Sequence, residues 1–233
     1  MYVWKCWRDT RRFFVFFLAI AALPMPMAAF ASRFGTAIRD AGPLAFQNTF
    51  MMVVTAVAYA LATICAIQEF TDKTAHFLFT KPRSRSYFVW MSWLVGFTEL
   101  LTVAAVNLFI GWRVLAHFGV RAFSDAGPQT QDWNLVSPQK FVEAAVFACF
   151  AYTLTFALAA ILRSGLKGLG ASLGLLTGTV GVSAELQMRW RINLPLPPQQ
   201  IGHLSVALSE CAWVMLALLF VLAAQLVVER AEI

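Results

Sequence analysis

Long apolar runs separated by short polar segments dominate the chain. A helix needs about 20 mainly apolar residues to cross the hydrocarbon core of a bilayer, and six runs are close to that length or beyond it. Strands of a membrane barrel would instead appear as short segments of alternating polarity, so the pattern predicts an all-α membrane protein with a bundle of six transmembrane helices. The predicted spans are residues 13–31, 44–67, 87–112, 141–162, 166–184 and 212–228.

The composition agrees with this pattern and narrows the function. Hydrophobic residues make up 60% of the 233 residues and charged residues only 13%, against about 45–50% and about 25% in soluble domains. The spans cover more than half of the chain, so we expect a single transmembrane domain, 1–233, without a separate soluble catalytic domain. A soluble enzyme and a nucleic-acid-binding module are therefore excluded, and the net charge of +6 favours membrane lipid head groups as partners.

The distribution of basic residues predicts the orientation. If the N-terminus is cytoplasmic, segments 1–12, 68–86, 163–167 and 229–233 are inside and hold eleven of the 18 Lys and Arg residues. Cytoplasmic loops are enriched in these residues, so we expect a multi-pass protein of the inner (plasma) membrane with both termini in the cytoplasm.

The N-terminal segment has two open interpretations. Trp4 and Trp7 alternate with basic residues over 1–12, which favours a short helix in the head-group region over a simple anchor. The basic segment, the apolar run and Ala29-Phe30-Ala31 also resemble a cleavable signal peptide. The run over 13–31 is long enough to span the membrane by itself, which favours retention.

The 19-residue segment between the second and third spans is longer than a simple connection requires. Phe70, Thr74, Phe77 and Leu78 fall on one face of a predicted helix, and Pro82 ends it. An amphipathic cytoplasmic helix of this kind either lies on the lipid surface or docks into a groove of a partner protein.

This segment resembles the first cytoplasmic loop of the permease subunits of type-2 ABC exporters. In that family a Glu opens the loop, a Gly-Thr pair follows, and a Leu-rich turn leads into a Pro-x-Ser-Arg motif. Lys73 stands where the family usually has Gly, and Arg83 where an apolar residue is common. The matching positions here are Glu69, Thr74, Leu78, Pro82, Ser84 and Arg85.

The resemblance implies a mechanism. In the family this loop forms a coupling helix that fits a cleft on a separate ABC ATP-binding subunit, and two permeases, either two copies or two homologues, assemble with two ATPases. This chain contains no G-x-x-x-x-G-K-[ST] sequence, so ATP and Mg²⁺ are expected on the partner, with no cofactor bound by this chain. The residues that the resemblance assigns to ATPase coupling are Glu69, Phe70, Lys73, Thr74, Phe77, Leu78, Pro82, Ser84 and Arg85.

Glu99 lies near the middle of the third predicted span, where an ionised carboxylate is costly and a functional role is the default hypothesis. A substrate path through Glu99 and Asn107 is one interpretation, and hydrogen bonds between helices are the other.

Gly170, Gly174 and Gly178 repeat every four residues, which predicts a face for close helix packing within the subunit or across a dimer interface. No catalytic motif appears, and the four cysteines lack metal-ligand spacing.

The sequence therefore favours the permease subunit of an ATP-driven exporter. A gradient-driven carrier or channel that uses Glu99 is the first alternative, and a membrane anchor or assembly factor is the second.

Overall fold

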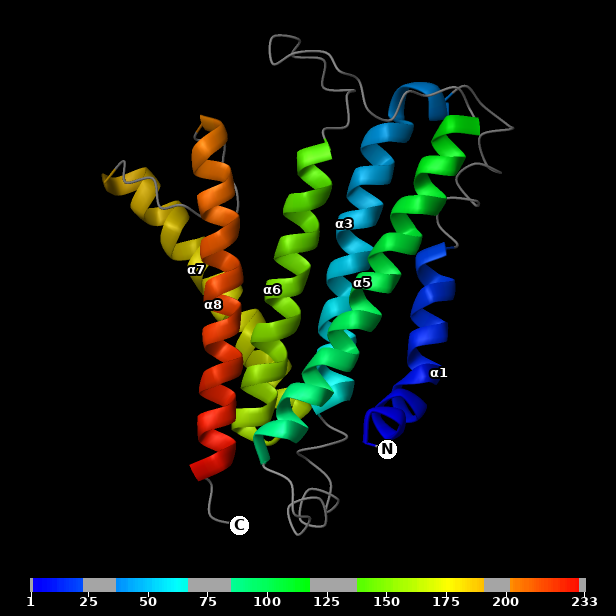
Figure 1. The fold of residues 1–233 in the computed structure, drawn as a ribbon. Coiled ribbons are helices and arrows are strands. Elements are labelled where there is room, and N and C mark those ends of the chain that lie inside the picture. Colours follow the sequence, from blue (N-terminus) through cyan, green and yellow to red (C-terminus); the bar gives the residue numbers. More distant parts are fainter. Residues whose placement is uncertain (1, 23–36, 67–84, 118–137, 191–201, 231–233) are drawn as a thin grey trace.

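A computed structural model describes residues 2–22, 37–66, 85–117, 138–190 and 202–230 of the chain (Figure 1). Over these ranges every element is a helix and no strand occurs, which confirms the prediction of an all-α protein. The helices are α1 (Tyr2–Ala22), α3 (Ala37–Ala66), α5 (Arg85–His117), α6 (Pro138–Leu162), α7 (Gly165–Trp190) and α8 (Gly202–Arg230).

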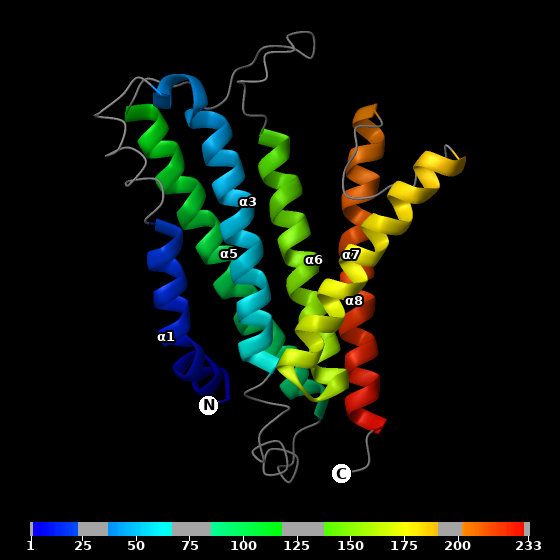
Figure 2. The same cartoon turned by 180° about the vertical axis from the view of Figure 1, so that it is seen from behind.

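The six helices run alternately up and down the bundle (Figures 1 and 2). The N-terminal end of α1 and the C-terminal end of α8 therefore lie at the same end of the molecule. The end of α3, the start of α5 and the turn between α6 and α7 also lie there. We call this the terminal end of the bundle.

Four helices within the described residues have the length and apolar composition to cross a membrane: Gln47–Ala66, Ser86–Arg113, Phe141–Leu162 and Trp213–Arg230. Each corresponds to one of the predicted spans. The protein is thus built around membrane-embedded helices. The predicted spans at 13–31 and 166–184 are not among the four, and a total of six spans stays a prediction.

The helices extend beyond several predicted spans. Helix α3 begins at Ala37, α7 continues to Trp190 and α8 begins at Gly202, because hydropathy marks only the lipid-facing length of a helix. At the N-terminus, 1–12 does not form a helix of its own. The Arg-Arg-Phe-Phe sequence at 11–14 contains no helix breaker, so α1 is continuous from Tyr2 to Ala22.

The most extensive helix contact is between α3 and α6. Phe50 of α3 packs edge-on against Phe141 of α6, with 5.2 Å between ring centroids. Small residues of α6, among them Ala148 and Ala160, are fully or almost fully buried. Helices associate in lipid mainly through close packing, and small side chains permit it. The α3–α6 contact is accordingly the centre of the bundle.

A tight turn joins α6 to α7. Arg163 adopts a positive φ of 50°, a left-handed conformation typical of the residue after a helix. The Ser164 amide donates to the Ala159 carbonyl at 3.1 Å, and the Lys167 amide donates to Ser164 Oγ at 3.4 Å. Ser164 thus caps α7, and the reversal brings the start of α7 back against the end of α6.

Gly168 makes this return possible. A Cβ added to Gly168 would lie closer than van der Waals contact to the backbone of Ala159 on α6. One turn further on, Thr155 Oγ1 donates to Ser172 Oγ at 2.9 Å, and both side chains are buried. The first turns of α7 are therefore fixed to α6 by a backbone-to-backbone approach and a hydrogen bond.

Candidate functional site

The predicted coupling segment lies almost entirely outside the described residues. Only Arg85 is included, as the first residue of α5. The described structure does contain the two helices that this segment joins: α3 ends at Ala66 and α5 begins at Arg85, both at the terminal end of the bundle (Figure 1). The contacts at the start of α5 therefore determine which helices would move if the segment between α3 and α5 were displaced.

The first turns of α5 are hydrogen-bonded to α3 and α8. Ser92 Oγ donates to the Cys65 carbonyl oxygen of α3 at 3.3 Å. Trp90 Nε1 donates to Gln225 Oε1 of α8 at 2.8 Å, and Gln225 Nε2 donates to Glu229 Oε1 at 3.1 Å. Polar bonds of this type hold membrane helices in a defined register.

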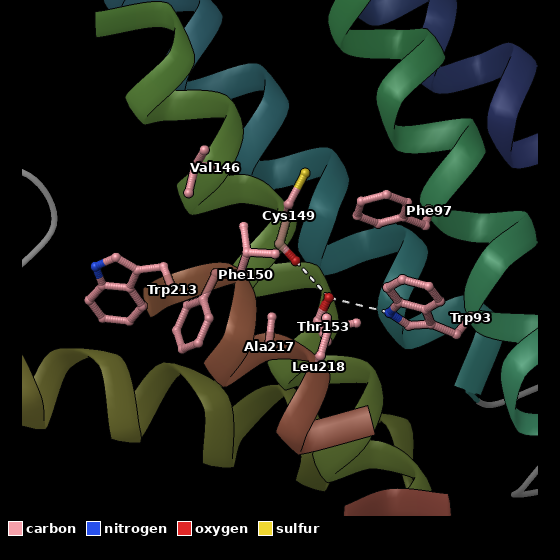
Figure 3. Close-up of a pocket in the computed structure, with 10 residues that line it drawn as sticks. Trp93, Phe97, Val146, Cys149, Phe150, Thr153, Trp213, Ala217 and Leu218 are labelled. Carbon is pink, nitrogen blue, oxygen red and sulfur yellow. Dashed lines mark hydrogen bonds between the residues drawn. The ribbon is translucent and has the colours of Figure 1, made fainter. Parts of the chain in front are cut away.

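The same turns of α5 are also bonded to α6. Tyr152 is fully buried, and its hydroxyl donates to the Trp93 carbonyl oxygen at 2.9 Å. Trp93 Nε1 in turn donates to Thr153 Oγ1 at 3.3 Å, and Thr153 Oγ1 donates to the Cys149 carbonyl at 2.8 Å. Figure 3 shows the bonds of Thr153. We call Trp90, Ser92 and Trp93 the α5 junction, because they connect α5 with α3, α6 and α8.

Gly96, one turn beyond the α5 junction, allows Tyr152 to approach α5. A Cβ added at Gly96 would overlap the Tyr152 hydroxyl and lie 2.7 Å from Cys65 Sγ. The missing side chain thus makes room for groups from both α6 and α3. Close packing and hydrogen bonding coincide here, which makes this part of α5 a rigid connection.

An apolar cavity of about 80 Å³ lies beside the α5 junction, between α5, α6 and α8. Aromatic rings form much of its wall, and Phe150 packs edge-on against Trp213 with 4.5 Å between centroids (Figure 3). The cavity is about half the size of an engineered 150 Å³ cavity that binds benzene. The cavity is comparable in volume to a small apolar group. Its lining includes Trp93, Phe97, Cys149, Phe150, Thr153, Trp213 and Leu218.

Glu99 lies elsewhere on α5, against α1. Its side chain is 3% exposed, and Thr10 of α1 is 0% exposed. The Thr10 hydroxyl donates to Glu99 Oε1, whereas Oε2 has no hydrogen-bond partner among the described residues. Glu99 therefore joins two helices and does not line the apolar cavity.

Asn107 and the three repeated glycines of α7 lie outside the wall of the apolar cavity. Asn107 is buried on α5, 2% exposed, and like Glu99 is not part of the cavity wall. Its place in a substrate path stays a prediction.

A Cβ added to Gly170, Gly174 or Gly178 would meet no atom within 4 Å among the described residues. The close packing predicted for these glycines within the subunit is not present at their Cβ positions, and packing against another chain stays a prediction.

Among the described residues, no three His, Cys, Asp or Glu side chains lie close enough together to hold a metal ion. Comparison of the chain with protein-family models, with curated proteins and with solved structures finds no match.

Sequence reasoning did not single out the α5 junction. The available signal was the Trp-Met-Ser-Trp sequence at 90–93, which places three side chains with hydrogen-bond donors in an apolar span. Tyr152, Thr153 and Gln225 are polar residues in two other spans. Such residues find partners across helices in lipid, but the sequence does not specify which partner each one meets.

Proposed function

We propose that the chain is the membrane-spanning permease subunit of an ATP-driven exporter of the ABC-2 type. Residues 69–85 receive the movement of a separate ATP-binding subunit, and two permease copies or homologues form the transport path. The resemblance of the segment to the family's coupling loop supports this proposal. It involves Glu69, Thr74, Leu78, Pro82, Ser84 and Arg85.

The α5 junction is the structural observation that most favours the proposal. It begins five residues after the coupling segment, and its hydrogen bonds reach α3, α6 and α8. A displacement at the start of α5 is therefore transmitted to three helices at once. A permease driven by an external ATPase requires such a connection, because local movement of one loop must rearrange the whole bundle.

The proposal is tested by disrupting the docking surface. We expect Glu69→Lys combined with Leu78→Asp to abolish co-purification of an ATP-binding subunit from native membranes, because the variant reverses one charge and places another on the apolar face of the predicted helix. The partner is identified by mass spectrometry and by its phosphate-binding loop. ATP hydrolysis by the purified complex, stimulated by the permease, is expected to fall with it.

Lys167→Glu is the matched control. Lys167 is exposed in the first turn of α7, at the terminal end of the bundle. Reversing its charge tests whether any change of charge at this end is sufficient to release the ATPase. The control is expected to retain the ATPase. Equal co-purification with the double variant and the wild type contradicts the docking assignment.

The burial of Glu99 favours one alternative, a carrier or channel driven by an ion gradient. In that case Glu99→Gln abolishes transport, because the carboxyl binds the coupling ion. For the ATP-driven exporter we expect ATP-dependent transport to continue in the same variant. Transport measured in vesicles with ATP, and separately with a proton gradient, distinguishes the two functions.

A further inference from the structure

Glu99 has no counter-charge within three turns on either side of it along α5. It is the only charged residue of α5 between Ser86 and Trp112, and its side chain is 3% exposed. An isolated buried charge is strongly unfavourable unless it is paired and hydrogen-bonded. The helices packed against α5 therefore decide whether Glu99 can be ionised.

Among the side chains that the structure describes on those helices, none is a charged partner of Glu99. Residues 47–66 of α3, 144–162 of α6 and 211–228 of α8 contain no Asp, Glu, Lys or Arg. On α1, Arg8, Arg11 and Arg12 are exposed, and the hydrogen-bond partner of Glu99 among the described residues is the neutral Thr10. The charged or titratable groups with described side chains on these four helices are Arg8, Arg11, Arg12, Tyr59, Cys65, Glu143, Cys149, Tyr152, Cys211, Glu229 and Arg230, and none of them bonds to Glu99.

The hydrogen bonds of Thr10 also favour a neutral acid. Two of the acceptors within reach of the hydroxyl are Glu99 Oε1 and the Trp7 carbonyl oxygen at 3.4 Å, but the hydroxyl has a single proton. If Glu99 carries a proton on Oε1, the acid donates to Thr10 Oγ1 and Thr10 donates to Trp7. Both hydrogen bonds then form without any movement of the heavy atoms.

The second carboxyl oxygen gives an independent indication. Glu99 Oε2 is buried without a hydrogen-bond partner among the described residues. In a carboxylate this oxygen shares the negative charge, and leaving it unsolvated is far more costly than leaving a neutral carbonyl oxygen unpaired. The geometry is thus suited to a carboxylic acid and not to its anion.

We propose that Glu99 and Thr10 form a proton-binding site that fastens α1 to α5. The bound proton allows the carboxyl to remain in the apolar contact and to donate to α1. Removal of the proton leaves an unpaired charge in the interior, which weakens the contact of α1 with α5. This site does not depend on which energy source drives transport.

Infrared spectroscopy tests the proton directly. In the full-length protein reconstituted in lipid vesicles at neutral pH, the spectrum of the wild type minus that of Glu99→Gln is expected to contain the carbonyl band of one protonated carboxylic acid. Glu143→Gln, which removes another buried carboxyl, is the control and leaves that band in place. A carboxylate band in the difference spectrum for Glu99 overturns the proposal.

A stability comparison tests the link to Thr10. Gln resembles the protonated acid in shape and lack of charge, so Glu99→Gln is expected to leave the thermal midpoint close to that of the wild type. Glu99→Gln is also expected to remove the fall in midpoint that the wild type shows as the pH rises. A large fall in midpoint at neutral pH in Glu99→Gln, or an unchanged pH dependence, contradicts a neutral Glu99.

The carboxyl is also a reaction site for apolar carbodiimides. The acid adds across a C=N bond: its oxygen bonds to the carbodiimide carbon, the proton moves to nitrogen, and an O-acylisourea forms without a leaving group. Transfer of the acyl group to nitrogen then gives a stable N-acylurea. Dicyclohexylcarbodiimide in vesicles is expected to modify the wild type and Glu143→Gln at Glu99, as read by peptide mass spectrometry. A water-soluble carbodiimide that modifies Glu99 equally well overturns its placement in the apolar interior.

Discussion

Gly168→Ala is expected to lower the free energy of unfolding by about 3 kcal/mol, the upper part of the usual range for overpacking. The new methyl group would overlap the backbone of Ala159, and backbone atoms cannot move aside as the end of a flexible side chain can. Helix α7 must therefore separate from α6, which also stretches the hydrogen bond between Thr155 and Ser172. Unfolding of the purified protein by denaturing detergent measures the effect.

Gly174→Ala is the matched control, because it makes the same change on the same helix. A Cβ at Gly174 meets nothing within 4 Å among the described residues, so only the helix propensity changes. Alanine is favoured over glycine by about 1 kcal/mol in a helix interior, and we expect a neutral or slightly stabilising result. Equal destabilisation by the two variants contradicts the assigned contact. If Gly174→Ala alone disrupts an oligomer, these glycines pack against another chain.

The two glycine sites show what spacing along the sequence can and cannot predict. A four-residue repeat places Gly170, Gly174 and Gly178 on one face of a helix, but it does not specify what this face packs against. Which part of α7 meets a neighbour depends on the angle at which α7 crosses α6. That angle is set by the turn at Arg163 and Ser164. That turn brings Gly168 against α6. Its conformation depends on tertiary structure and has no clear signature in the sequence.

The membrane helices were more predictable than the contacts between them. The run at 141–162 was found almost to the residue, since α6 covers Pro138–Leu162, because a long apolar run in lipid has no alternative to a helix. The interior position of Glu99 was also anticipated. Its partner Thr10 was not, because 1–12 was assigned to the membrane surface, whereas α1 continues through this segment and buries Thr10 against α5.

The α5 junction was predictable in its place along the chain but not in its contacts. Its position just after the predicted coupling segment follows from the sequence, but its three partner helices are evident only from the structure. The polar side chains of one α5 segment meet α3, α6 and α8 because this end of α5 lies among them, whereas α1 contacts α5 through Thr10 and Glu99. Under the proposed function, the fit of Gly96 against Tyr152 is therefore a requirement for transmission as well as for folding.

Gly96→Ala is expected to lower the free energy of unfolding by about 2 kcal/mol, as is typical of overpacking. The added methyl group overlaps the Tyr152 hydroxyl and lies 2.7 Å from Cys65 Sγ. Tyr152 cannot rotate away without losing its hydrogen bond to the Trp93 carbonyl. The closest contacts of the new methyl group are thus with one oxygen atom and one sulfur atom. The destabilisation due to the oxygen can therefore be measured separately, by a substitution that removes it.

Tyr152→Phe provides that separation. Alone, it removes a buried hydrogen bond and is expected to cost about 1 kcal/mol. In the Gly96→Ala background it also removes the overlapping oxygen, so the double variant is expected to be more stable than Gly96→Ala alone. Unfolding of the four proteins gives the coupling energy between the two positions, which is about 0.5–3 kcal/mol for groups in direct contact. Additive effects of the two substitutions contradict the packing of Tyr152 over Gly96. If the coupling is present and the double variant also regains ATP-dependent transport lost in Gly96→Ala, then the contact between α5 and α6 is the part of the bundle through which the coupling segment acts.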